Sequence, residues 1–286
     1  MAAFHTGGFF AQGKGSRMTE RIRRAGRLQF CFCLQIMLAL VNLQPLPAGA
    51  ASLVEAIKDT KRSVVAIGTY QLLGQPPVRL LGTGFIVADG GYVITNAHVL
   101  PKELDAKNQE SLQAFYGIEA QAKNYELDVV AEDEVHDLAL LRIIGNTKLP
   151  ALRLSGTMAP EGTRTAITGY PLGSLLGLYP ITHEGIISAV KERSFAAYNQ
   201  GELTAERVRR LRASFVVYQI DTNAYPGNSG SPLYDPETRK VLGVVQSVGV
   251  RDKTQKSAIE APTGFTFAVP ARFVSELLAR NNLPGY

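Results

Sequence analysis

Cysteine is nearly absent from this chain of 286 residues, because Cys31 and Cys33 are its only two and both lie among the first 50 residues. The rest of the chain therefore has no disulfide framework, no thiol nucleophile and no cysteine-ligated zinc. The four histidines show no paired spacing, so the sequence predicts no metal site. Any catalysis must use other side chains, and we expect no cofactor.

A surplus of one charge is also missing from most of the chain. The formal net charge of +5 comes from the first 50 residues, which hold six basic side chains and one acidic side chain. The rest of the chain holds 24 of each sign. Proteins that bind nucleic acid carry clustered basic residues against the phosphate backbone. We therefore expect no nucleic-acid partner.

The first 50 residues have the three-part layout of a secretory signal. A basic stretch at 21–27 precedes an apolar stretch at 28–43, and small residues follow up to Ala50. A signal peptidase recognises small residues before the bond that it cuts. We expect cleavage between Ala50 and Ala51, an exported chain in the periplasm or outside the cell, and no stable membrane insertion afterwards.

Two alternatives concern this leader. Met18 directly precedes the basic stretch, and a start there would make residues 1–17 an extension. An uncleaved membrane anchor is the second alternative. The apolar stretch has 16 residues, fewer than the ~20 that a spanning helix needs, and this length favours cleavage.

Short β-branched runs separated by turns dominate the chain after residue 62. The 27 glycines and 15 prolines follow no fixed period, and 45% of the residues are hydrophobic, so a packed core is expected rather than a fibre or disorder. The pattern predicts an all-β fold of two β-barrels, at 51–150 and 151–286, because it restarts near Pro150. The expected strands lie at 63–70, 82–88, 92–97, 138–143, 165–170, 215–220, 241–248 and 264–269.

Two helices are expected at the ends of this pattern. A capping box at 52–55 begins a helix that runs to about Lys61. After Pro270, apolar residues at helical spacing predict a closing helix over 271–280 that packs on the second barrel.

A serine between glycines is the sharpest feature of the chain. In the stretch 227–232 (GNSGSP), a turn can present the Ser229 hydroxyl outward while backbone N–H groups converge on one point. A hydroxyl needs a base, and the base needs a third group that fixes its tautomer. His98, at the end of one strand, and Asp137, at the start of another, are the candidates. We expect the three residues to meet in a cleft between the barrels.

These motifs resemble those of trypsin-like serine endopeptidases, and within them the HtrA branch. The resemblance implies two six-stranded antiparallel barrels of chymotrypsin type, cleavage of exported or misfolded polypeptides, and assembly of many members into homo-trimers. HtrA proteins usually continue into a PDZ domain, whereas this sequence ends after its closing helix, so activation through such a domain is not carried over. The matching stretches are GTGFI at 82–86, VITNAHV at 93–99, DLALL at 137–141, GYPLG at 169–173, GIIS at 185–188, QID at 219–221 and PGNSG at 226–230.

The resemblance assigns a role to each candidate residue. Ser229 would be the nucleophile, His98 the general base, and Asp137 the group that orients His98. The backbone N–H groups of Gly227 and Ser229, with Asn228 between them, would form the oxyanion hole.

Substrate preference is read from three further positions. In trypsin-like peptidases the floor of the main specificity pocket lies six residues before the serine, which here is Asn223, and a carboxylate there would select Lys or Arg. Val245 stands where glutamyl endopeptidases place a histidine, and Gln246 follows it in the pocket wall. We therefore expect a preference for uncharged, small to medium apolar residues on the acyl side of the cut bond.

Alternatives remain open at this point. An acid-specific endopeptidase would use His183 or Gln246 in place of the missing histidine. A proteolytically silent peptide-binding or chaperone module on the same fold is a third interpretation. Apart from this substrate-binding alternative, His183 is expected to be structural, and His136 is expected to be a solvated loop residue rather than a second base.

Residues 191–214 interrupt the strands with charge, and 204–213 have a helical pattern. In HtrA-like proteins the corresponding loop acts as a sensor that orders the oxyanion hole. We hypothesise that it regulates activity here, and the alternative is a solvated insertion.

Overall fold

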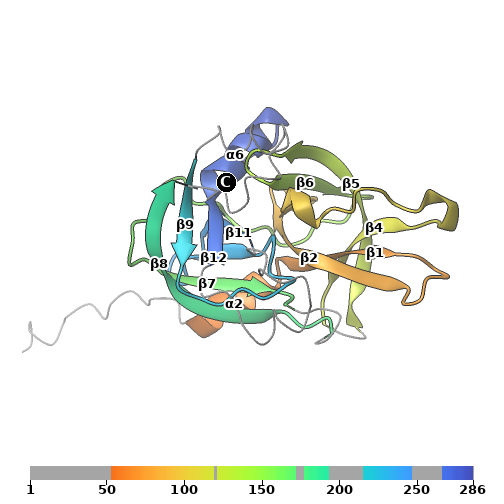
Figure 1. The fold of residues 1–286 in the computed structure, drawn as a ribbon, viewed down its shortest axis with the longest axis horizontal. Coiled ribbons are helices and arrows are strands. Elements are labelled where there is room, and N and C mark those ends of the chain that lie inside the picture. Colours follow the sequence, from red (N-terminus) through yellow and green to blue (C-terminus); the bar gives the residue numbers. More distant parts are fainter. Residues whose placement is uncertain (1–52, 119–120, 172–176, 193–214, 247–265, 286) are drawn as a thin grey trace, which may run out of the picture. The chain divides into compact units, whose positions relative to one another are not determined.

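Twelve strands close into two antiparallel six-stranded barrels in the computed structural model (Figure 1). The structure describes residues 53–118, 121–171, 177–192, 215–246 and 266–285, and the count of strands refers to these ranges. The barrels belong to one compact unit that spans residues 51–286. The all-β, chymotrypsin-like fold expected from the sequence is confirmed.

The first barrel follows the order β1-β2-β3-β6-β5-β4. Its apolar runs form strands that are buried on both faces. On β1, Val65 and Ile67 pack in the interior of the barrel, while Val64 and Ala66 pack in a cluster that the two barrels share. The bounds are β1 Val64–Tyr70, β2 Val78–Val87, β3 Tyr92–Thr95, β4 Ser111–Tyr116, β5 Lys123–Asp133 and β6 Leu138–Ile143.

The second barrel repeats this arrangement in the order β10-β11-β12-β9-β8-β7. Its interior is filled by buried apolar residues such as Ile167, Ile187 and Val245. The bounds are β7 Arg164–Gly169, β8 Ile181–Glu192, β9 Val216–Ile220, β10 Pro232–Tyr234, β11 Val241–Gln246 and β12 Thr266–Pro270.

Both expected helices are present. Helix α2 (Leu53–Lys61) buries Ala56 beside Tyr234 of the second barrel. Helix α6 (Ala271–Arg280) presents its apolar residues to the cluster shared by both barrels, so it covers their junction rather than the second barrel alone (Figure 1). Two 3-10 turns, η1 (Ala97–Val99) and η2 (Ala106–Asn108), follow β3.

Four strands were not expected from the sequence: β4, β5, β8 and β10. Strand β5 buries only two of its residues and β8 only one, so neither strand has a run of buried apolar residues. Strand β10 has only three residues and begins at Pro232.

The expected signal peptide and the helical pattern at 204–213 lie outside the described residues. Within the described ranges no helix has the length and apolarity needed to span a bilayer.

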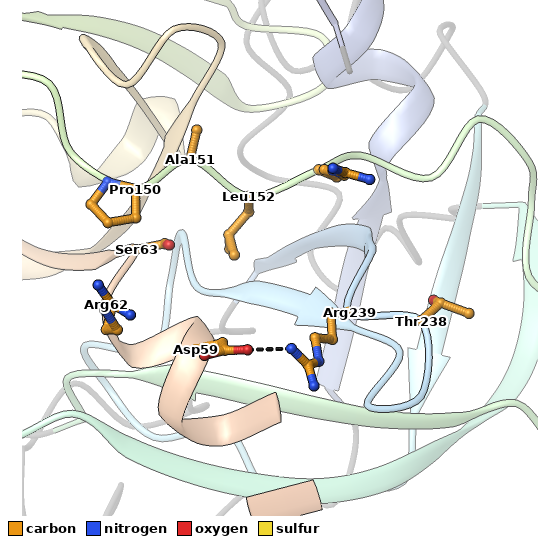
Figure 2. Close-up of a pocket in the computed structure, with 9 residues that line it drawn as sticks. Asp59, Arg62, Ser63, Pro150, Ala151, Leu152, Thr238 and Arg239 are labelled. Atoms are coloured by element: carbon orange, nitrogen blue, oxygen red, sulfur yellow. Dashed lines mark hydrogen bonds and ion pairs between the residues drawn. The ribbon is translucent and has the colours of Figure 1, made fainter. Parts of the chain in front are cut away.

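A pocket of about 370 Å³ opens where the end of α2 meets the linker between the barrels and the turn between β10 and β11 (Figure 2). Asp59 of α2 and Arg239 of the turn form an ion pair at this junction. The pair joins the N-terminal helix to the second barrel. None of the residues that the sequence assigned to catalysis lines this pocket.

Candidate active site

His98 lies in the 3-10 turn that follows β3. Two hydrogen bonds hold the turn against the residue that precedes β6. The backbone amide of Ala97 and the side-chain amide of Asn96 both donate to the carbonyl of Asp137, at 3.2 and 2.9 Å. Val99 packs in the core of the first barrel and anchors the other end of the turn. The imidazole itself is 47% exposed, so it is accessible to a substrate.

Asp137 directly precedes β6 and has a left-handed backbone, with φ of +55°. This conformation is unusual for a residue other than glycine and often marks a functional constraint. The Asp137 carboxylate contacts His98 twice: Oδ1 accepts from the backbone amide at 2.9 Å, and Oδ2 lies 2.7 Å from Nδ1. The contact with the backbone amide fixes the carboxylate beside His98, and the contact with Nδ1 orients the imidazole.

Ser229 occupies a turn of the second barrel that requires glycine on both sides. Gly227 and Gly230 have φ of +97° and +86°. A Cβ atom at Gly230 would lie 2.0 Å from the carbonyl oxygen of Thr83, so only glycine fits there. The turn brings Ser229 Oγ to 3.0 Å from His98 Nε2.

The three side chains thus form a continuous line from carboxylate to imidazole to hydroxyl across the two barrels. A proton on Nδ1 is held by the Asp137 carboxylate, which leaves Nε2 as the acceptor that faces the hydroxyl. Such an arrangement can remove a proton from Ser229 and make it a nucleophile.

The residues expected at the substrate do not share one open surface. Asn223 is exposed, whereas Val245 is fully buried in the interior of the second barrel. Gln246 is 4% exposed, and its Nε2 donates to Asp137 Oδ2 at 2.9 Å and to the carbonyl of His136 at 3.3 Å. The side chain of Gln246 therefore contacts the catalytic candidate Asp137. Substrate contact at the three positions stays a prediction.

The expectation of a solvated His136 is wrong. Its side chain is 18% exposed, its ring stacks on Phe273 of α6 with centroids 3.9 Å apart, and Nδ1 lies 3.0 Å from Asp133 Oδ2. Arg280 of α6 also donates to Asp133. The partners on α6 lie far along the chain, so no local pattern could identify them.

Asp133 is a buried carboxylate with two cationic or polar partners. Burial alone would raise the pKa of Asp133, but hydrogen bonds from His136 and Arg280 outweigh it and hold the pKa below its usual value. The carboxylate is therefore charged at neutral pH. It fastens α6 to the segment that leads into Asp137.

His183 of β8 is half buried, with its ring 5.9 Å from that of Tyr225. Its Nε2 atom is buried and has no hydrogen-bond partner among the described residues. Loss of solvent lowers the pKa of His183, because the charged imidazole is disfavoured by burial. The imidazole is therefore neutral near pH 7.

In the described ranges, no three His, Cys, Asp or Glu side chains gather as a metal site would require.

The chain is similar to trypsin-like peptidases in sequence and in fold. The family model of the trypsin-like peptidase domain matches residues 82–244. Serine protease HTRA1 of Xenopus tropicalis is 27% identical over 205 residues, which cover 70% of this chain and 36% of that protein. The magnetosome formation protease MamE of Paramagnetospirillum magneticum is 26% identical over 255 residues, which cover 81% of this chain and 31% of MamE.

Solved structures show the same fold. The active form of the Rv3671c protease from M. tuberculosis superposes with a TM-score of 0.57 and 26% identity, covering 82% of this chain and 86% of that one. A serine endoprotease from Yersinia pestis gives a TM-score of 0.55 at 23% identity, covering 80% and 66%. The chain spans about a third of the length of the curated relatives named above, from 31 to 36%.

Proposed function

The chain belongs to the trypsin-like peptidase family, and from this membership we propose that it is an HtrA-like serine endopeptidase with His98, Asp137 and Ser229 as its catalytic triad. The observation that carries the proposal is the line of contacts through His98, with Nε2 3.0 Å from Ser229 Oγ and Nδ1 2.7 Å from Asp137 Oδ2. An imidazole held at both nitrogens in this way is oriented to transfer a proton.

The reaction proceeds in two halves. Ser229 Oγ attacks the carbonyl carbon of the peptide bond while His98 Nε2 takes its proton, and a tetrahedral intermediate forms. His98 then gives the proton to the leaving amine, the C–N bond breaks, and an ester to Ser229 remains. Water attacks this ester with the same proton transfers and releases the acid. Asp137 stabilises the imidazolium in both halves.

The developing oxyanion would be bound by the backbone N–H groups of Gly227 and Ser229, with Asn228 between them. The left-handed backbone of Gly227 supports this role, because it lets the two amides on either side of Asn228 turn toward one point. One such donor is typically worth about 3 kcal/mol in the transition state.

Gln246 holds the Asp137 carboxylate of the proposed triad through a hydrogen bond. Its amide donates to the same Asp137 oxygen that faces His98, so it holds the carboxylate in the orientation that reaches the imidazole. We assign Gln246 a positioning role in addition to the substrate-wall position that the sequence suggested.

The preferred substrates would be exported or misfolded polypeptides with an uncharged apolar residue on the acyl side of the cut bond. Asn223 supports this preference, because it offers no charge to pair with a basic or acidic side chain. An acid-specific alternative would use His183, whose buried Nε2 has no hydrogen-bond partner among the described residues and would donate to a carboxylate. Export and a homo-trimeric assembly are part of the same proposal and rest on the HtrA resemblance.

Digestion of an unfolded protein tests the proposal. Purified residues 51–286 should cleave reduced, unfolded casein, and Ser229→Ala should abolish cleavage while the melting temperature stays unchanged. Ser188→Ala, which removes an exposed hydroxyl from β8, is the matched control and should cleave as the parent does. Equal activity in Ser229→Ala and the parent would refute the triad, and an inactive parent would support the silent module.

A further inference from the structure

Thr83 of β2, in the first barrel, forms hydrogen bonds with the turn of the second barrel that carries Ser229. It is fully buried. Its Oγ1 donates to the carbonyl of Gly227 at 2.7 Å and accepts from the backbone amide of Tyr170 at 2.9 Å. Tyr170 directly follows β7, so one hydroxyl joins a strand of the first barrel to two segments of the second.

The direction of these hydrogen bonds is fixed by the chemistry of a hydroxyl. Thr83 Oγ1 carries a single proton, and a backbone amide can only donate. Because the Tyr170 amide donates to Oγ1, the hydroxyl proton must point to the Gly227 carbonyl. The network therefore holds that carbonyl in one orientation, with no alternative arrangement of its protons.

The Gly227 carbonyl belongs to the peptide unit that separates the two proposed oxyanion donors. The other end of this unit, the Asn228 amide, donates to the Tyr225 carbonyl at 3.0 Å. The peptide unit between Gly227 and Asn228 is thus fixed at both ends. Rotation of this unit would turn the Gly227 and Ser229 amides relative to each other, since it is the one peptide plane between the planes that carry these two amides.

The backbone of Thr83 holds the same turn at a second point. Its amide donates to the Ser229 carbonyl at 2.9 Å, and its own carbonyl accepts from Thr95 Oγ1 at 2.7 Å. The carbonyls on both sides of Asn228 are therefore bonded to one residue. Thr83 itself is held in place by the next strand of its own barrel.

We infer that Thr83 is a positioning residue for the oxyanion hole, and that its hydroxyl orients the Gly227 amide through the Gly227 carbonyl. The inference rests on the proposed function and adds a contribution of the first barrel to transition-state binding beyond His98 and Asp137. Thr83 does not touch the substrate. Its effect should therefore appear in the chemical step and in the binding of transition-state analogues, not in ground-state binding.

The test compares Thr83→Val with Thr83→Ser in a peptide-cleavage assay. Valine keeps the shape of threonine and removes the hydroxyl, and serine keeps the hydroxyl. We expect Thr83→Val to lower kcat by roughly 10- to 100-fold with KM changed by less than about threefold, and to weaken inhibition by a peptide aldehyde in proportion. Thr83→Ser should keep kcat within about threefold of the parent.

Thr168→Val is the matched control, because Thr168 is a fully buried threonine of β7 whose hydroxyl bonds to Thr182 and Tyr234 away from the turn. A merely structural role for Thr83 predicts that the two valine variants lose stability alike and keep the same kcat. Such a result in an active parent overturns the inference and leaves the proposed triad intact.

If Thr83→Val does not fold, Thr83→Cys takes its place, because a thiol is a weak hydrogen-bond donor of similar size. The same fall in kcat at constant KM is then required. A parent that cleaves no substrate would instead refute the proposed function, so the two failures are distinguishable.

Discussion

The side-chain amide of Gln246 lies 2.9 Å from Asp137 Oδ2, although the two residues come from different barrels and are 109 positions apart in the chain. The same oxygen lies 2.7 Å from His98 Nδ1. One oxygen of Asp137 is therefore held between His98, which lies in the first barrel, and Gln246, which lies on a strand of the second barrel. The two barrels meet at this point.

We expect Gln246→Leu to lower kcat/KM by about tenfold, because a hydrogen bond to a charged group is worth about 1.5–3 kcal/mol. Gln246→Glu should lower it further, since a second carboxylate beside Asp137 repels the first. Steady-state kinetics measure both effects. Gln113→Leu, at a buried glutamine of the first barrel, is the control and should leave kcat/KM unchanged.

The link between α6 and the Asp137 segment should stabilise the fold in a pH-dependent way. The pKa of Asp133 is lower in the folded chain than in the unfolded chain, so its carboxylate contributes stability above the unfolded pKa of about 4. This contribution is lost as the pH falls through the folded pKa. Asp133→Asn should therefore unfold at lower urea concentration than the parent at pH 7, and the difference should shrink toward pH 3.

Arg280→Gln should show a weaker form of the same behaviour, because His136 still pairs with Asp133 in this variant. We expect a loss of about 1–3 kcal/mol at pH 7. Arg142→Gln removes an exposed pair with Asp128 and should cost less stability than Arg280→Gln, because water screens the exposed pair. Equal losses in the two arginine variants would show that Asp133 does not need its partner on α6.

His183 should also make the fold less stable as the pH falls, although the physical reason differs from that for Asp133. Its pKa is lowered by burial, so the unfolded chain binds its proton first as the pH falls below about 6.5. Stability is then lost between pH 6.5 and the folded pKa. His183→Gln cannot take up this proton, and urea unfolding at pH 7.5 and 5.5 should show a smaller difference for the variant than for the parent.

Specificity should follow charge more strongly than size. Peptides with Val, Ala or Leu on the acyl side of the cut bond should be cleaved better than peptides with Arg or Glu. Placing an unpaired charge in a neutral pocket costs several kcal/mol, whereas one methylene changes discrimination by about 1–3 kcal/mol. Competition between these peptides and mass spectrometry of the products measure the order. A clear preference for Glu would support the acid-specific alternative.

The sequence could predict the elements whose apolar residues cluster locally. Strands such as β1 and β6 are largely buried on both faces and consist mostly of apolar residues, and α6 has a clear helical period. Strand β5 could not be predicted in this way, because its exposed face is charged and its pairing with β4 and β6 is decided by closure of the barrel.

The candidate site likewise contains residues that a local motif could predict and residues that only long-range packing brings together. His98, Asp137 and Ser229 stand in recognisable motifs, so their meeting could be expected. The surroundings of Asp137 could not, because Gln246 and Phe273 reach it or its neighbour His136 through long-range packing. Thr83 was visible only as a small residue between two glycines, and its two-sided hydrogen bonding depends on the docking of the barrels.

The proposed triad is tested most directly by the site at which a fluorophosphonate attaches to the purified protein. Only an activated serine attacks this reagent at neutral pH. We predict a single adduct on the tryptic peptide that contains Ser229, its absence in Ser229→Ala, and a strongly reduced rate in His98→Ala. Attachment to another serine, or no attachment under conditions in which the protein is folded, would refute the proposed triad.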